Sequence, residues 1–238
     1  MNEVTEITGT LSVVATPIGN MEDITLRAIR VLRECDYILC EDTRVTGKLL
    51  ARHEIKAKMK RYDARTSESV HEEILEDLLD GKHLVLVSDA GTPGVSDPGV
   101  LLIQKIRTVG HTMPNSVKIE VIPGPSAVTA SFSIAGLTGN QFSFLGFVPN
   151  KKGRQTFFES LPSYNHPVIF FESTHRIMKT IESLNNLAIN HPINCHIARE
   201  LTKMHEEMIV GSPEYVLQQF ISEPVRQKGE FVIIVSMK

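Results

Sequence analysis

The chain has 238 residues, of which 42% are hydrophobic and 22% are charged, and its formal net charge is −3. This composition excludes an intrinsically disordered chain, and the near-neutral balance argues against nucleic-acid binding over the whole surface, though not against a local basic patch. The length suits one large domain or two of ordinary size.

Cysteine usage and hydropathy predict a cytoplasmic protein. Cys35, Cys40 and Cys195 show no metal-ligand spacing, so we expect reduced thiols in the core and no bound metal. No apolar run is long enough to span a membrane, and the acidic, polar N-terminus does not resemble a secretory signal.

The first half of the chain alternates strands with helices. Short apolar runs predict strands at 10–16, 37–40, 58–62, 83–87 and 117–122. Apolar residues at helical spacing predict helices at about 24–35, 43–52, 69–79 and 98–109, with Asp23 as the N-cap of the first. This alternation predicts a mainly parallel sheet with helices on both faces.

The second half changes character after Pro123-Gly124-Pro125, which predicts two α/β domains, 1–122 and 123–238. Its predicted helices are 126–135, 154–160, 174–187 and one that starts at Pro213 with Ser212 as its cap. The predicted strands are 141–147, 167–171, 194–199, 206–210 and 230–235. Too few residues separate the third from the fourth for a crossover helix, so we expect a hairpin and a mixed sheet.

Several loops rich in glycine, proline or charge follow directly after predicted strands. The most unusual is SDAGTPGVSDPG at 88–99, where glycines permit close approach of a ligand and prolines stiffen the loop. In open α/β sheets ligands bind at the carboxyl ends of strands, so this loop predicts a cradle for a small molecule. The alternative is a surface Ω-loop. Similar loops occur at 15–20, 41–44, 123–127, 172–176 and 198–203.

Charged residues gather in some of these loops. Glu41-Asp42-Thr43-Arg44 could orient a hydroxyl or a phosphate, or Asp42 or Thr43 could simply cap the next helix. The basic runs 56–61 and 151–154 are either solvated faces or places that hold an RNA backbone.

Taken together, the motifs resemble one family. ATPIGNMEDITLRA, CEDTR, LVSDAGTPGVSDPG, IPGPSA, FLGFVP, FFESTHRI, ARELTKMHEE and KGEFVIIV occur in this order. They are similar to the ribosomal RNA small subunit methyltransferase I family of the tetrapyrrole methylase superfamily, and the similarity runs from about Leu11 to Val235. The resemblance implies a two-domain α/β fold of the tetrapyrrole methylase type, with a parallel N-terminal sheet, a mixed C-terminal sheet and an active-site cleft between the domains.

The resemblance also implies an S-adenosylmethionine-dependent enzyme that methylates the ribose 2′-hydroxyl of a cytidine in 16S ribosomal RNA, and a homodimer. The N-terminal domain would serve RNA and cofactor, and the C-terminal domain the cofactor. The implied cofactor contacts are Pro17, Ile18, Asp89, Ala90, Gly91, Thr92, Ser126, Ala127, Phe171, Ala198, Arg199, Gly229 and Glu230.

A ribose hydroxyl is a poor nucleophile, so a neighbouring carboxylate would help it to attack. The candidate bases are Asp42, Glu41 and Glu200, and Arg44, Arg199 and Lys203 are candidates to hold a flanking phosphate. The candidate RNA-binding residues are Lys151, Lys152, Arg154 and Lys203. Two alternative functions remain, a tetrapyrrole C-methyltransferase of the same superfamily and a non-catalytic cofactor-binding module.

Overall fold

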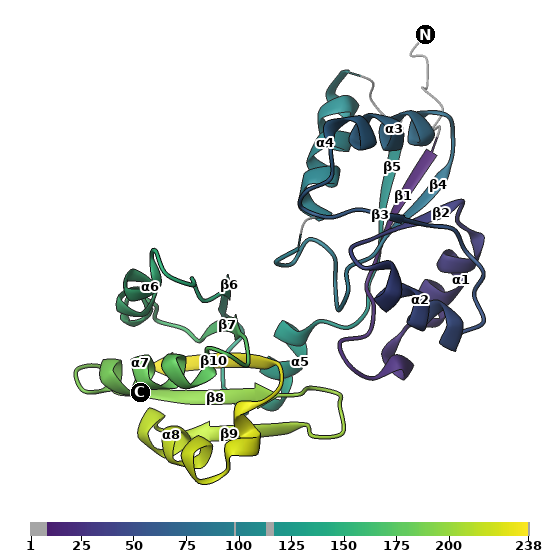
Figure 1. Ribbon diagram of the computed structural model, residues 1–238. Helices are drawn as coiled ribbons and strands as arrows, with labels where there is room; N and C mark the ends of the chain where they lie inside the picture. Colours follow the sequence, from purple (N-terminus) through teal and green to yellow (C-terminus); the bar gives the residue numbers. More distant parts are fainter. Residues whose placement is uncertain (1–8, 98, 113–116, 238) are drawn as a thin grey trace. The chain divides into compact units, whose positions relative to one another are not determined.

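The computed structural model describes residues 9–97, 99–112 and 117–237, and it divides into two compact units (Figure 1). The first unit is Met1–Ser126 and the second is Ala127–Lys238. The division therefore follows the Pro123-Gly124-Pro125 segment by one residue.

The first unit contains a five-stranded sheet in the order β3-β2-β4-β1-β5. Its strands are β1 (Gly9–Val14), β2 (Tyr37–Cys40), β3 (Met59–Arg61), β4 (His83–Leu86) and β5 (Val117–Ile122). All neighbouring strands pair in parallel, which confirms the predicted parallel sheet. Because the strands are parallel, the loops that follow them all leave from the same edge.

Helices cover both faces of this sheet. One apolar cluster joins alternate strand residues to Ala28 of α1 (Leu26–Glu34) and Leu49 of α2 (Thr43–Arg52). The opposite cluster contains side chains from α3 (Glu68–Leu79) and α4 (Gly99–Thr112). Pro98, the predicted first residue of the fourth helix, lies outside the described residues.

The predicted cap of the first helix is wrong. Asp23 ends a short 3-10 helix, η1 (Met21–Asp23), and the helix proper starts after Thr25. The Thr25 hydroxyl accepts a hydrogen bond from the N–H of Ala28 at 3.1 Å. The chain thus inserts one short turn before α1, and a threonine two residues later provides the same capping chemistry.

The second unit contains a mixed five-stranded sheet in the order β6-β7-β10-β8-β9. The strands are β6 (Ser143–Phe147), β7 (Val168–Glu172), β8 (Ile193–Arg199), β9 (Glu207–Gly211) and β10 (Phe231–Met237). β6 and β7 pair in parallel, and the other neighbours are antiparallel. β8 and β9 form the predicted hairpin.

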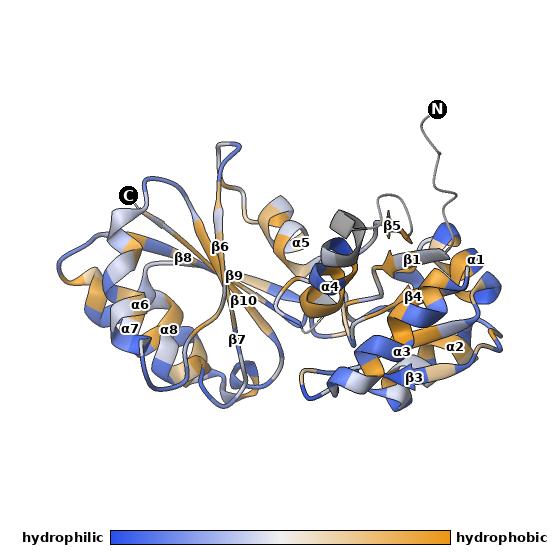
Figure 2. Ribbon diagram, turned by 90° about the horizontal axis from the view of Figure 1, so that it is seen from above, coloured by the Kyte–Doolittle hydropathy of each residue, from blue (hydrophilic) through white to orange (hydrophobic). Residues whose placement is uncertain are grey.

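Helices lie on either side of the second sheet (Figure 2). One face packs against α6 (Arg154–Ser160), α7 (Ile177–Ala188) and α8 (Pro213–Ser222), and α5 (Ala127–Ile134) packs against β10. Short 3-10 helices occupy Leu161–Ser163 and Pro224–Gln227. As predicted, Ser212 caps α8 by accepting a hydrogen bond from the N–H of Tyr215.

The helix predicted from Thr174 begins instead at Ile177. The Thr174 hydroxyl donates a hydrogen bond to the carbonyl of Gly229 and accepts one from the same residue's N–H. This long-range anchor holds the first residues of the segment outside the helix.

Candidate functional site

A polar pocket of about 660 Å³ lies at the carboxyl ends of the three adjacent strands β3, β2 and β4 in the first unit. The predicted catalytic residues Glu41, Asp42 and Arg44 line it together with Asp89. Arg61, the last residue of the basic run 56–61, lines it too, as do three residues that the sequence did not single out, namely Asp63, Ala64 and Arg65. The order of the strands would have identified these residues, because they lie at the end of β3 or just after it and β3 pairs with β2. In the sequence, 18 residues separate Cys40 of β2 from Met59 of β3.

Asp42 begins helix α2 and binds Arg44. One Asp42 oxygen accepts a hydrogen bond from the N–H of Arg44 at 2.8 Å, and both oxygens accept hydrogen bonds from its guanidinium. These bonds to the Arg44 guanidinium and backbone hold the pKa of Asp42 well below its usual range. A carboxylate with so low a proton affinity is a weak general base, so the capping alternative describes Asp42 better.

Glu41 has the opposite electrostatic environment. It follows directly after β2, is half-buried and lines the same pocket. Burial raises the pKa of its carboxyl, and the negative charge of Asp89 raises it further. Asp97 and Asp63 act in the same direction. A carboxylate with a raised pKa binds a proton more readily, so Glu41 is the stronger candidate base of the two.

The SDAGTP loop is fastened to the loop after β1 by its backbone. The N–H of Thr16 donates to the carbonyl of Gly91 at 2.9 Å, and the N–H of Gly91 donates to the carbonyl of Thr16 at 3.1 Å. The Thr16 hydroxyl also donates to the carbonyl of Ser88. Gly91 has a φ of +81°, and a Cβ there would lie 3.3 Å from the Ile18 side chain. These bonds join the SDAGTP loop and the loop after β1 into one structure, which we call the glycine wall, and they distinguish it from a plain surface loop.

The same wall continues into the loop after β5. The Thr92 hydroxyl donates a hydrogen bond to the carbonyl of Pro125 at 3.1 Å. A Cβ at Gly124 would lie 3.0 Å from the Cβ of Ala15, so the backbones approach closely here. The structure thus brings together the predicted cofactor residues of the first unit: Pro17, Ile18, Asp89, Ala90, Gly91, Thr92 and, at the end of the unit, Ser126.

Asp89 connects this wall to the charged pocket. Its side chain lies in the pocket lining, and one of its oxygens accepts a hydrogen bond from the N–H of Asp42 at 3.0 Å. Farther along the loop, Asp97 accepts hydrogen bonds from the N–H groups of Gly94 and Gly99. Asp89 therefore contributes to the pocket, and Asp97 shapes the turn.

In the charged loop between β8 and β9 of the second unit, Glu200 and Lys203 pair with each other and with Glu230. The Glu200 carboxylate accepts a hydrogen bond from the N–H of Glu230 at 2.9 Å and from Lys203 at 3.1 Å. Lys203 also pairs with Glu230 at 2.9 Å. Burial by itself would raise the pKa of Glu200, but the bond from Glu230 and the charge of Lys203 bring it below its ordinary value. This environment argues against Glu200 as a base. Lys203 is already paired with two carboxylates, so most of its charge is compensated within the protein and little is left for a phosphate.

Arg199 is also occupied within the protein. Its guanidinium donates to the carbonyls of Lys228, His205 and Val225 and pairs with Glu207 at 3.1 Å. The residue is 6% exposed. A guanidinium held in this way has little capacity left for a phosphate, so its backbone is the part that stays a candidate for cofactor contact.

The remaining cofactor candidates of the second unit lie near strand ends. Ala198 is fully buried in β8, and Phe171 of β7 makes edge contacts with the rings of Phe144 and Phe147. Gly229 has a φ of +123°, and a Cβ there would come within 3 Å of the Glu200 side chain. Ala127 begins α5.

Arg154, a predicted RNA-binding residue, is part of a buried ion cluster. The Glu172 side chain is completely buried and pairs with Arg154 at 3.4 Å and Arg176 at 2.8 Å. Thr180 donates a hydrogen bond to the same carboxylate at 2.6 Å. Arg154 therefore stabilises the second unit, whereas Lys151 and Lys152 are exposed in the preceding turn and stay available for RNA.

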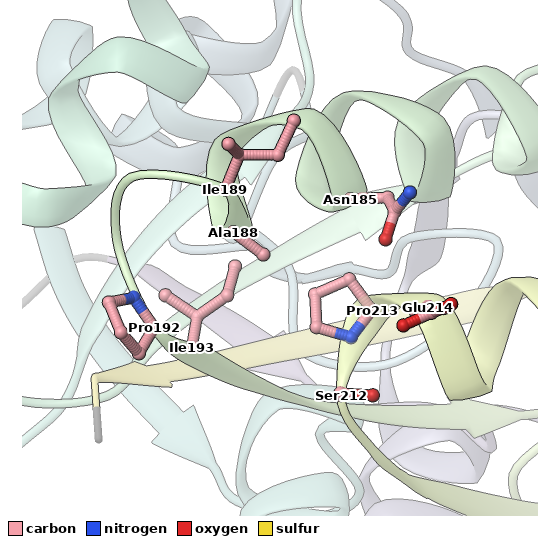
Figure 3. A pocket seen from close by; sticks show the side chains of 8 residues that line it. All are labelled: Asn185, Ala188, Ile189, Pro192, Ile193, Ser212, Pro213 and Glu214. Atoms are coloured by element: carbon pink, nitrogen blue, oxygen red, sulfur yellow. The ribbon is translucent and has the colours of Figure 1, made fainter.

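A second pocket, of about 400 Å³, lies at the opposite end of β8 from Arg199 (Figure 3). It lies between the end of α7 and the start of α8, with Ile189 and Ile193 among its apolar lining. Glu214 is its one ionisable lining side chain. This chemistry offers no set of groups for proton transfer or phosphate binding.

The described residues contain no group of three or more His, Cys, Asp or Glu side chains placed to hold a metal ion. Among the described helices, none combines the length and apolar character needed to cross a membrane.

Comparisons with known proteins give a consistent result. The sequence model for Tetrapyrrole (Corrin/Porphyrin) Methylases matches residues 10–215. The Ribosomal RNA small subunit methyltransferase I of Thermotoga maritima is 38% identical over 230 residues, which cover 97% of this chain and 99% of that protein. The protein of the same name from Xylella fastidiosa is 40% identical, with 95% and 81% of the two chains covered.

Solved structures share the fold at low sequence identity. A cobalt precorrin-4 methyltransferase superimposes with a TM-score of 0.69 at 17% identity and covers 95% of this chain and 94% of its own. A uroporphyrin-III C-methyltransferase from Thermus thermophilus, complexed with S-adenyl homocysteine, gives a TM-score of 0.64 at 18% identity, with 96% and 97% covered. These likenesses establish the two-sheet α/β architecture of the tetrapyrrole methylases.

Proposed function

Because the chain belongs to the ribosomal RNA small subunit methyltransferase I family of the tetrapyrrole methylases, we propose that it methylates the ribose 2′-hydroxyl of a cytidine in 16S ribosomal RNA. S-adenosylmethionine is the methyl donor. The observation that carries the proposal beyond the family name is the pocket beside the glycine wall, where Glu41 has a raised pKa among exposed arginines.

The residues of the wall fit the proposed cofactor. Gly91 adopts a backbone conformation that side chains rarely allow, so the loop presents peptide groups in place of a side chain. Asp89 offers an exposed carboxylate that can accept hydrogen bonds from hydroxyl or amino groups. Pro17, Ile18, Ala90, Thr92 and Ser126 would complete the contacts in this unit, and Ala127, Phe171, Ala198, Arg199, Gly229 and Glu230 are the proposed contacts in the second unit. When bound, S-adenosylmethionine supplies a methyl group on a positively charged sulfur.

Glu41 would act as the general base. Its carboxylate accepts the proton of the ribose 2′-hydroxyl, which makes the oxygen a better nucleophile. Its raised pKa supports this role, since proton transfer is most effective when the pKa of the base is close to the working pH. Asp42 instead holds Arg44 and the first turn of α2 in place, and Glu200 shapes the loop after β8.

A target nucleotide within structured RNA must leave its stack to reach a pocket of this kind. Exposed Lys151 and Lys152 are proposed to bind the RNA backbone outside the pocket. We also propose a homodimer that works in the cytoplasm. Phe142 and Phe147 leave 37% and 52% of their surface exposed at and beside β6, which offers an apolar contact for a second copy.

Methyl transfer to RNA tests the proposed function directly. The purified chain should transfer labelled methyl from S-adenosylmethionine to small ribosomal subunits or to 16S ribosomal RNA. Mass spectrometry of nuclease digests should then find 2′-O-methylcytidine. Methylated RNA that lacks a ribose methyl would overturn the 2′-hydroxyl assignment, and methylation of a porphyrinoid with unchanged RNA would favour the tetrapyrrole methyltransferase alternative. A chain that binds the cofactor and methylates neither would favour a non-catalytic module.

A further inference from the structure

The last residue of β3 and the turn that follows it, residues 61–66, are anchored beside the polar pocket. Tyr62 is 2% exposed, and its backbone N–H donates to the carbonyl of Cys40 at the end of β2. Its phenol is 3.0 Å from Nε2 of His71 in α3. The turn is therefore tied to the neighbouring strand and to a helix, so the residues on either side of Tyr62 have fixed positions.

Asp63 organises the rest of this turn. Its N–H donates to the Thr66 hydroxyl at 2.8 Å, and its carboxylate accepts a hydrogen bond from the N–H of Arg65 at 2.8 Å. The other Asp63 oxygen pairs with the guanidinium of Arg61 at 2.7 Å. Arg61 and Arg65 are thus presented to the pocket by a backbone that is already ordered.

The arginines of the pocket differ in how far their charge is already neutralised. Arg44 pairs with Asp42, and Arg61 pairs with Asp63. The exposed Arg65 forms no ion pair within residues 9–97, 99–112 and 117–237, and it is one of the residues that line the pocket. A planar guanidinium in this state is suited to two parallel hydrogen bonds with phosphate oxygens.

The pocket also has groups that match the rest of a ribonucleotide. Its carboxylates are able to accept hydrogen bonds from ribose hydroxyls or from the exocyclic amine of cytosine. A ligand with one phosphodiester and several hydrogen-bond donors would therefore satisfy both kinds of side chain. A simple anion would satisfy the arginines and leave the carboxylates facing it.

We propose that Arg65, assisted by Arg61, binds the phosphodiester adjacent to the ribose that is methylated. This proposal rests on the proposed function, since it assumes that the pocket receives RNA. It assigns the turn after β3 a positioning role: the arginines fix the phosphate and thereby place the 2′-hydroxyl near Glu41.

The test compares Arg65→Ala with Arg52→Ala in methylation and RNA-binding assays. Arg52 is also an exposed arginine, but it is the last residue of α2 and so lies at the opposite end of that helix from Asp42 and Arg44. Arg65→Ala should raise the KM for RNA roughly tenfold and leave S-adenosylmethionine affinity unchanged. The magnitude of the slope of log affinity against log salt concentration should fall by about 0.7, as expected for one lost contact to single-stranded RNA. Arg65→Lys should recover part of the affinity, and Arg52→Ala should match the unsubstituted chain.

An Arg65→Ala variant that keeps the KM and the salt slope of an active unsubstituted chain would overturn the proposal, and so would an equal loss in Arg52→Ala. Unchanged cofactor binding by calorimetry shows that the variant is folded. If the unsubstituted chain binds the cofactor but methylates no RNA, the proposed function itself fails and the phosphate contact fails with it.

Discussion

Each unit carries a glutamate that directly follows a strand within a charged loop, Glu41 after β2 and Glu200 after β8, and the two have different environments. In the first unit, Glu41 is half-buried among other carboxylates and its pKa is raised. In the second, Glu200 accepts hydrogen bonds from Lys203 and from the Glu230 backbone, and its pKa is lowered. Both residues follow directly after a strand in a charged motif. The neighbours of each carboxyl set its pKa, and of the two it is Glu41 that has the higher proton affinity.

The largest expected effect comes from removing the two carboxylates in turn. Glu41→Gln should lower kcat by about 10²- to 10⁴-fold, the usual contribution of a general base, with unchanged S-adenosylmethionine affinity. The matched variant Glu200→Gln should keep kcat within a few-fold. Single-turnover methylation of RNA measures both. A larger fall in kcat for Glu200→Gln than for Glu41→Gln would contradict the assignment of Glu41 as the base.

The second prediction concerns stability, because in the second unit the buried carboxylate of Glu172 pairs with two arginines. Glu172→Ala leaves Arg154 and Arg176 half-buried without their shared carboxylate. We expect the free energy of unfolding to fall by about 3 kcal/mol, as is common when one partner of a buried pair is removed. Urea unfolding measures this change. A fall of less than about 1 kcal/mol would mean that the arginines are solvated once the carboxylate is gone.

The pH dependence of the rate should report Glu41. Glu41 must lose its proton to act as a base, so kcat should rise with pH through its raised pKa, by up to tenfold per pH unit on the acidic side. Glu41→Gln should lose this acidic limb. Glu200→Gln should retain it, because the pKa of Glu200 lies below the ordinary value of 4.5. An unchanged acidic limb in Glu41→Gln would assign the titration to another group.

The smallest expected effect is on the free energy of unfolding, which Glu41→Gln and Glu200→Gln should change in opposite directions. The folded protein disfavours ionised Glu41, so Glu41→Gln should raise the free energy of unfolding at neutral pH. It favours ionised Glu200, so Glu200→Gln should lower the free energy of unfolding at neutral pH, and this loss should shrink as pH falls through the lowered pKa of Glu200. Thermal unfolding at two pH values measures both shifts. If both variants were stabilised at neutral pH, or both destabilised, the opposite electrostatic environments of Glu41 and Glu200 would be contradicted.

Much of the fold could be predicted from local patterns. The strand at 37–40 and the helices at 43–52 and 154–160 coincide with β2, α2 and α6, because short apolar runs and helical spacing are properties of the segment itself. Long-range contacts lie outside such patterns. Thr174 delays the start of α7 through its bonds to Gly229, a residue 55 positions away.

The candidate site, like the fold, could be predicted only in part from the sequence. The sequence identified Glu41 and Asp89, since Glu41 directly follows β2 and Asp89 lies in the loop after β4, and the carboxyl ends of these strands share one edge. It did not distinguish Glu41 from Asp42 or Glu200, because a carboxylate's pKa depends on neighbours that local sequence does not specify. The same limit explains why Arg154 and Arg199 looked free for a ligand, although Glu172 and Glu207 already bind them.

The reciprocal backbone bridge between Thr16 and Gly91 has a consequence for substitution. Peptide N–H and carbonyl groups are present whatever the side chains are, so the two hydrogen bonds of the bridge do not require a particular side chain at position 16. Position 91 is different, because its positive φ favours glycine. The two loops are thus joined by peptide geometry, and that geometry depends on a single glycine.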